Sequence, residues 1–144
     1  MKIYKPKFWD KNKSFVSYFL LPFTLITLLI IFLRKKLIKS IKFKISVICI
    51  GNIYLGGTGK TPFAIFLANN LLKIKKKPVI IRKFYKSHSD EYNMIKKHFD
   101  QLITSNSRVE AIKRAEFSNF DTVILDDGFQ DYSIKKKLNI ICFN

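Results

Sequence analysis

The chain reads Gly56-Gly57-Thr58-Gly59-Lys60-Thr61-Pro62 between an apolar run, Ile45–Ile50, and a helical pattern that begins near Pro62. Strand, glycine-rich turn, Lys-Thr and helix is the order that a phosphate-binding loop requires. The glycines allow backbone N–H groups to turn inward, and the helix N-terminus adds positive partial charge. Lys60 would reach the phosphates, and the Thr61 hydroxyl would ligate Mg²⁺. The sequence therefore predicts a nucleoside triphosphate site formed by Gly56, Gly57, Thr58, Gly59, Lys60 and Thr61.

The motif departs from its strict form at one position. The pattern G-x-x-x-x-G-K-[S/T] has glycine where this chain has Tyr54. An ordinary glycine-rich turn between a strand and a helix is the alternative interpretation. The Lys60-Thr61 pair favours the phosphate-binding loop, because a simple turn has no need of either side chain.

Short apolar runs alternate with helical patterns from Lys42 onward. We expect strands at Ile45–Ile50, Pro78–Ile81, Gln101–Thr104, Val123–Leu125 and Asn139–Phe143, and helices at Pro62–Ile74, Glu91–Phe99 and Arg108–Ala115. Strands separated by helices imply βαβ units and a parallel sheet. The predicted fold class is α/β, with a P-loop NTPase-like parallel sheet and flanking helices that span residues 42–144.

A membrane element precedes this core. No charged side chain occurs from Phe15 to Leu33, and about 20 apolar residues suffice to cross a bilayer. Lysines lie on both sides of the run, so the positive-inside rule selects no orientation, and Pro22 would kink or break the helix. We expect residues 1–41 to form an N-terminal anchor with basic and aromatic flanks, which either spans the bilayer or enters it from one side. A buried core helix is the weaker alternative, because so small a domain could not cover it.

The charge balance favours anionic partners. Lys and Arg number 27 against 10 Asp and Glu, which gives a net charge of +17. Such a chain suits anionic lipid, phosphorylated substrates or nucleic acid. A membrane surface is the first expectation, and no nucleic acid is expected because no basic groove with interleaved aromatic residues is visible. Cys49 and Cys142 lie in apolar runs and are expected to be reduced, buried thiols.

Carboxylates supply the second chemical signal. Asp126 and Asp127 follow an apolar strand, where a phosphate-loop protein places a carboxylate that holds Mg²⁺ near the Thr of the loop. An ordinary turn around Gly128 is the alternative. Asp90 could be a general base, but its spacing alone favours Ser89 or Asp90 as a helix N-cap.

These motifs together resemble the N-terminal half of the tetraacyldisaccharide 4'-kinase family of lipid A biosynthesis. The matching features, in order, are Lys5-Pro6-Lys7-Phe8-Trp9 before an apolar helix that contains Leu21-Pro22, Gly51-Asn52 with Gly56-Gly57-Thr58-Gly59-Lys60-Thr61-Pro62, Asp90-Glu91, Arg108, and Asp126-Asp127-Gly128-Phe129-Gln130. The family also lacks the first loop glycine, which accounts for Tyr54. Three features depart from it: Ile81-Arg82-Lys83-Phe84-Tyr85 in place of Ser-Arg-Gly-Tyr, Asp131 in place of His, and an end at Asn144 where the family continues for about another half.

The resemblance implies ATP-dependent phosphorylation of the 4'-hydroxyl of a tetraacylated glucosamine disaccharide 1-phosphate, a glycolipid, at the bacterial inner membrane. The catalytic domain would face the cytoplasm. Lys60 would stabilise the transferred phosphoryl group, Thr61 with Asp126 or Asp127 would hold Mg²⁺, and Asp90 would be the general base. The alternative is a membrane-anchored nucleotide-binding remnant, or half of a split kinase, without activity alone. No feature of the sequence indicates the oligomeric state.

Overall fold

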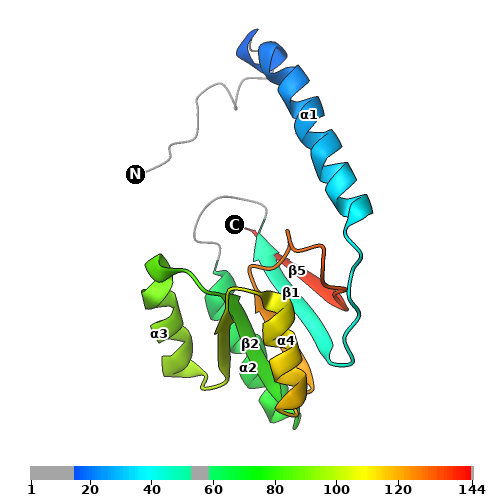
Figure 1. The fold of residues 1–144 in the computed structure, drawn as a ribbon. Coiled ribbons are helices and arrows are strands. Elements are labelled where there is room, and N and C mark those ends of the chain that lie inside the picture. Colours follow the sequence, from blue (N-terminus) through cyan, green and yellow to red (C-terminus); the bar gives the residue numbers. More distant parts are fainter. Residues whose placement is uncertain (1–14, 53–58, 144) are drawn as a thin grey trace. The chain divides into compact units, whose positions relative to one another are not determined.

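A computed structural model describes residues 15–52 and 59–143 (Figure 1). Three of the predicted loop residues, Gly56, Gly57 and Thr58, therefore lie outside the described residues. The chain divides into two compact units, Met1–Lys39 and Ser40–Asn144.

The first unit contains helix α1, Phe15–Leu37. Its segment Tyr18–Leu37 is long and apolar enough to cross a membrane, a judgement that rests on length and composition alone. The helix extends one turn beyond the predicted Leu33, because Arg34, Lys35 and Lys36 are good helix formers and their charge suits the C-terminal end of the dipole. Pro22 lies within the helix and does not end it.

The second unit is built on a parallel sheet with the order β3-β2-β4-β1-β5. Its strands are β1 (Ser46–Asn52), β2 (Pro78–Lys83), β3 (Leu102–Ser105), β4 (Thr122–Asp126) and β5 (Leu138–Cys142). Every residue of β4 is buried, as expected for the central strand of a parallel sheet that is covered on both faces. The five strands lie within two residues of their predicted bounds.

Helices cover the two faces of the sheet (Figure 1). They are α2 (Lys60–Lys73), the 3₁₀ turn η2 (Lys86–His88), α3 (Ser89–His98) and α4 (Arg108–Phe117). On one face, residues of α2 and α3 pack with Ile50, Ile80 and Ile124 of the sheet. On the other face, α4 packs against the alternate strand residues, Val79 and Val123 among them. The predicted α/β class with flanking helices is confirmed.

The end of β1 is fixed by a close approach of two segments. A Cβ atom built on Gly51 would lie 2.7 and 2.8 Å from two ring carbons of Phe129, so only glycine leaves space for this ring. Strand β1 runs on through Gly51 and Asn52, which pair with Ile141 and Cys142 of β5. The Gly-Asn segment and the loop after β4 are thereby held together.

Candidate functional site

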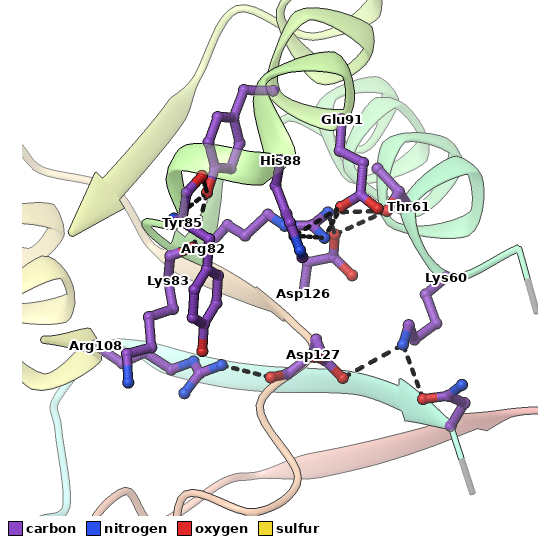
Figure 2. A network of polar contacts seen from close by, with 12 residues as sticks. Lys60, Thr61, Arg82, Lys83, Tyr85, His88, Glu91, Arg108, Asp126 and Asp127 are labelled. Carbon is purple, nitrogen blue, oxygen red and sulfur yellow. Dashed lines mark hydrogen bonds and ion pairs between the residues drawn. The ribbon is translucent and has the colours of Figure 1, made fainter. Parts of the chain in front are cut away.

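The candidate site lies at the carboxyl end of the sheet, where β1, β4 and β2 end beside the start of α2 (Figure 2). The carboxyl ends of parallel strands are the usual place for ligand sites in α/β folds. Strand register brings the polar residues together, because Asp126 of β4 pairs with Ile50 of β1 on one side and with Arg82 of β2 on the other. Strand partners in register point to the same face, so Arg82 and Asp126 both face α2 and α3.

Lys60 is the first residue of α2, and its ammonium group is held by two oxygens. Its Nζ atom donates to Asn52 Oδ1 at 2.8 Å and lies 3.3 Å from Asp127 Oδ1. Gly59, the N-cap residue, has a φ of 72°, a left-handed conformation that favours glycine. The turn therefore directs Lys60 across the ends of β1 and β4, as a lysine that contacts phosphate requires.

Thr61 and Asp126 form the buried pair of the site. The Thr61 hydroxyl donates to Asp126 Oδ2 at 3.0 Å, and both residues are buried. Burial raises the pKa of the Asp126 carboxyl, while the Arg82 guanidinium and the Thr61 hydrogen bond oppose that rise. Within residues 15–52 and 59–143, the buried Asp126 Oδ1 atom has no hydrogen-bond partner.

These two side chains fit a Mg²⁺ site. A hydroxyl oxygen beside a carboxylate with one unpartnered oxygen is the donor set that Mg²⁺ accepts from a protein when phosphates and water complete its shell. No group of three or more His, Cys, Asp or Glu side chains is placed to hold a metal in the described part of the chain. An ion at this site would therefore depend on the oxygens of its nucleotide.

Arg82 was not among the predicted site residues, yet its side chain links the Thr61–Asp126 pair to Glu91 of α3. Its Nη1 atom donates to Asp126 Oδ2 at 2.6 Å and to Thr61 Oγ1 at 3.0 Å, and its Nη2 atom is paired with Glu91. His88 Nδ1 lies 3.4 Å from Nη2. The Arg82 side chain is only 8% exposed. A charged residue directly after the apolar run Pro78–Ile81 is the signal in the sequence that could have identified it.

Asp127 adopts a strained backbone conformation that Arg108 supports. Its φ is 64°, which asparagine and aspartate tolerate better than other residues with a side chain. Its N–H donates to Ile50 O at 2.9 Å, and its carbonyl accepts from Arg108 Nη2 at 2.5 Å. Arg108 Nη1 also lies 3.6 Å from Asp131 Oδ2, so the residue that replaces the family's histidine holds this arginine.

Asp90, the predicted general base, lies in the first turn of α3 and is exposed. Among the described residues it makes no hydrogen bond or ion pair, whereas its neighbour Glu91 contacts Arg82. The N-cap interpretation of Ser89 and Asp90 is wrong, because α3 begins at Ser89 and its N-cap residue is His88. The catalytic role of Asp90 stays a prediction.

The hydroxyl group of Tyr92 helps to hold the segment after β2. Tyr92 OH accepts from the Tyr85 N–H at 2.6 Å and lies 3.0 Å from Lys83 O, to which it donates. The ring of Tyr92 also lies beneath the Arg82 guanidinium, 5.9 Å from centroid to Cζ. One residue of α3 therefore positions both Arg82 and the chain that follows it.

Comparison with known proteins identifies the family of the chain. The sequence model of a family described as tetraacyldisaccharide-1-P 4'-kinase matches residues 16–144. The chain belongs to this family. Two curated relatives, each named tetraacyldisaccharide 4'-kinase, come from Pelagibacter ubique, at 45% identity over 100% of this chain, and from Aliarcobacter butzleri, at 37% identity over 93%.

A solved structure of the tetraacyldisaccharide-1-P 4'-kinase family matches the fold as well. It is the crystal structure of an "apo" form of LpxK from Aquifex aeolicus in complex with ATP, with a TM-score of 0.70 and 29% sequence identity over 88% of this chain. The chain spans about half the length of the relatives it matches: 46% of the P. ubique protein and 48% of the A. aeolicus chain. The predicted family resemblance, to the N-terminal half, is confirmed.

Proposed function

We propose that this chain is the nucleotide-binding half of a kinase that transfers the γ-phosphoryl group of ATP to the 4'-hydroxyl of a tetraacylated glucosamine disaccharide 1-phosphate in lipid A biosynthesis. The observation that carries the proposal is the alignment of Lys60, Thr61 and Asp126 at one end of the sheet, with a buried carboxylate oxygen left unpartnered. Family membership supports the acceptor, and the ATP complex of the A. aeolicus protein supports the donor.

In this proposal Lys60 exchanges its bonds to Asn52 and Asp127 for the phosphates of ATP. Both present partners are oxygens at short range, so the ammonium group is already oriented and little side-chain entropy remains to be lost. A Mg²⁺ ion held by Thr61 and Asp126, with Asp127 nearby, would neutralise charge on the phosphates. Asp90 would accept the proton of the attacking hydroxyl, since it lies on the surface where a second substrate can reach it.

The proposed place of action is the cytoplasmic side of the bacterial inner membrane. Helix α1 supports this with its apolar span and the basic residues of its last turn, which suit anionic headgroups. An acceptor with four acyl chains stays in the bilayer, so a kinase attached to the same membrane would meet it there. The ATP would come from the cytoplasm.

Two measurements on the purified chain in detergent micelles test the proposal. The first is Mg-ATP binding by calorimetry for the wild type, Lys60→Ala and the control Lys113→Ala, which removes an exposed lysine from α4. We expect Lys60→Ala to weaken binding about 10-fold or more, equivalent to about 1.4 kcal/mol. The control should bind as the wild type does. Equal binding by all three chains would contradict the proposed loop.

The second measurement is transfer of labelled phosphate from ATP to the disaccharide precursor. The chain is assayed alone and mixed with the C-terminal half of the P. ubique relative as a separate polypeptide. We expect transfer in at least the mixture, and a loss of about 10²-fold or more with Lys60→Ala, the size of effect seen when one donor to a developing charge is removed. Binding of Mg-ATP without transfer in either assay would refute the kinase proposal and identify a nucleotide-binding remnant.

A further inference from the structure

The Arg82 guanidinium holds the same two side chains that would hold the metal ion. We propose that Arg82 takes the place of the cation in the nucleotide-free chain, and that it releases Thr61 and Asp126 and keeps only Glu91 when the metal enters with the nucleotide. The inference rests on the proposed function, because it requires a metal site at Thr61 and Asp126. It assigns to Arg82 the role of a positioning residue that prevents Mg²⁺ from binding without a nucleotide.

The distances would bring the two cations close together if both kept their present or expected contacts. Arg82 Nη1 lies 3.0 Å from Thr61 Oγ1 and 2.6 Å from Asp126 Oδ2. Since Mg²⁺ sits about 2.1 Å from its oxygens, an ion on Thr61 Oγ1 would lie within about 5 Å of Nη1. A divalent ion and a guanidinium at that distance repel strongly in a site where Asp126 is buried. We therefore expect the arginine to leave the threonine when the ion binds.

Glu91 is placed to receive the arginine. The guanidinium is a fork, with Nη1 on Asp126 and Nη2 on Glu91 (Figure 2), so it can release one carboxylate while it keeps the other. The Glu91 side chain is 45% exposed, so the displaced cation would move toward water. His88 Nδ1 lies 3.4 Å from both Nη2 and Glu91 Oε2, and the Tyr92 ring lies beneath the guanidinium. These groups already contact the guanidinium and would hold it after it leaves Asp126.

The arrangement makes metal and nucleotide binding cooperative. Without nucleotide, a metal ion would have to displace a buried arginine and gain only a hydroxyl and a carboxylate. With nucleotide, phosphate oxygens complete its shell and offset that cost. Removal of the guanidinium should therefore raise the affinity of the nucleotide-free chain for a divalent ion.

Binding of Mn²⁺, measured by the loss of its free electron paramagnetic resonance signal, tests this directly. The full chain in detergent micelles is titrated with Mn²⁺ alone as the wild type, Arg82→Gln, and Arg114→Gln, a matched loss of one exposed arginine on α4. We expect Arg82→Gln to bind Mn²⁺ about 10-fold more tightly than the wild type, within the usual range of coupling between sites. Arg114→Gln should match the wild type. An Arg82→Gln chain that folds and binds no more tightly would overturn the inference.

A second variant keeps the test decisive if Arg82→Gln does not fold. Glu91→Gln changes a half-exposed residue, with Glu110→Gln, an exposed glutamate on α4, as its control. With ADP present, Glu91→Gln should weaken Mn²⁺ binding about 5-fold or more, because the displaced guanidinium has lost its carboxylate. Unchanged binding would contradict the transfer of Arg82 to Glu91. If the wild type binds no Mn²⁺ even with ADP, the proposed metal site itself fails, which is a different outcome.

Discussion

Replacement of Gly51 by alanine would push a methyl group into the ring of Phe129. The added Cβ would lie 2.7 and 2.8 Å from two ring carbons, whereas carbon atoms normally approach no closer than about 3.5 Å. The ring would have to move by most of an ångström, and it is packed against the core under α4. Overpacking of this kind lowers the free energy of unfolding by about 1–3 kcal/mol. Alanine is favoured over glycine within a strand by about 0.5–1 kcal/mol, which offsets part of that loss.

We therefore expect Gly51→Ala to lower the free energy of unfolding by about 1–2 kcal/mol. At about 4–8 °C per kcal/mol for a domain of this size, the midpoint of thermal unfolding would fall by about 5–15 °C. Circular dichroism of the chain in detergent micelles measures this change. Nucleotide affinity should fall too, because Gly51 precedes Asn52 and Phe129 follows Asp127 by two residues, and these two neighbours hold Lys60.

The control is the double variant Gly51→Ala with Phe129→Leu, in which the smaller side chain leaves space for the methyl group. Phe129→Leu alone should destabilise, but by less than the roughly 3–5 kcal/mol of complete truncation in a core. The double variant should be more stable than the sum of the two single changes predicts. A Gly51→Ala chain within about 0.5 kcal/mol of the wild type, or a strictly additive pair, would refute the steric argument.

Three further results are expected. Glu116→Ala should lower the free energy of unfolding, measured by chemical denaturation, by about 1 kcal/mol, because Glu116 Oε1 accepts from two N–H groups before β1 at 2.7 and 3.1 Å. Glu116→Gln keeps an acceptor oxygen and should lose less of this stability. Gly59→Ala should lower the free energy of unfolding by about 1–2 kcal/mol, because alanine tolerates the φ of 72° poorly. A Cβ atom at Gly59 meets no atom within 4 Å among the described residues, so the backbone conformation alone would account for the loss. Asparagine tolerates this φ better, so an equally small loss for Gly59→Ala and Gly59→Asn would contradict the argument. Cys142 should react with a thiol reagent before Cys49, because burial raises the pKa of the Cys49 thiol. Unfolded cysteine ionises near pH 8.5 and the folded Cys49 thiol does not, so stability should fall as the pH rises above about 8.5. Equal thiol reaction rates in the folded chain would count against this burial.

The sequence predicted the elements well because apolar periodicity is a local property. The apolar run at Ile45–Ile50 identified β1, and the helical pattern from Pro62 identified α2 to within two residues at its start. It could not predict that β1 continues through Gly51 and Asn52, since neither residue favours strands. That extension depends on pairing with β5, some 90 residues further along the chain.

The site was harder to predict, because its contacts depend on which strands are neighbours. Nothing near Arg82 in the sequence indicates Asp126; the two meet because β2 lies next to β4 in the sheet. Asp90 and Glu91 differ by about 100° around α3, so only a structure decides which of them faces the arginine. Conversely, the placement of Lys60 and Thr61 together could be predicted, because they are consecutive residues at the start of one helix.

The position of β4 in the sheet order has a consequence for how the chain folds during synthesis. Strands β1 and β2 do not pair with each other; each pairs with β4, which is made after both of them and after β3. Strands β1 and β2 are apolar and buried in the folded chain, and they have no shared partner strand until residues 122–126 have been synthesised. Pairing with β4 must then close loops of about 40–75 residues, which costs conformational entropy. A nascent chain that stops before Thr122 would form separate fragments, β2 with β3 and β1 alone, with apolar edges open to aggregation. The order of emergence places α1 first, so this apolar helix is complete before any part of the sheet that follows it has formed.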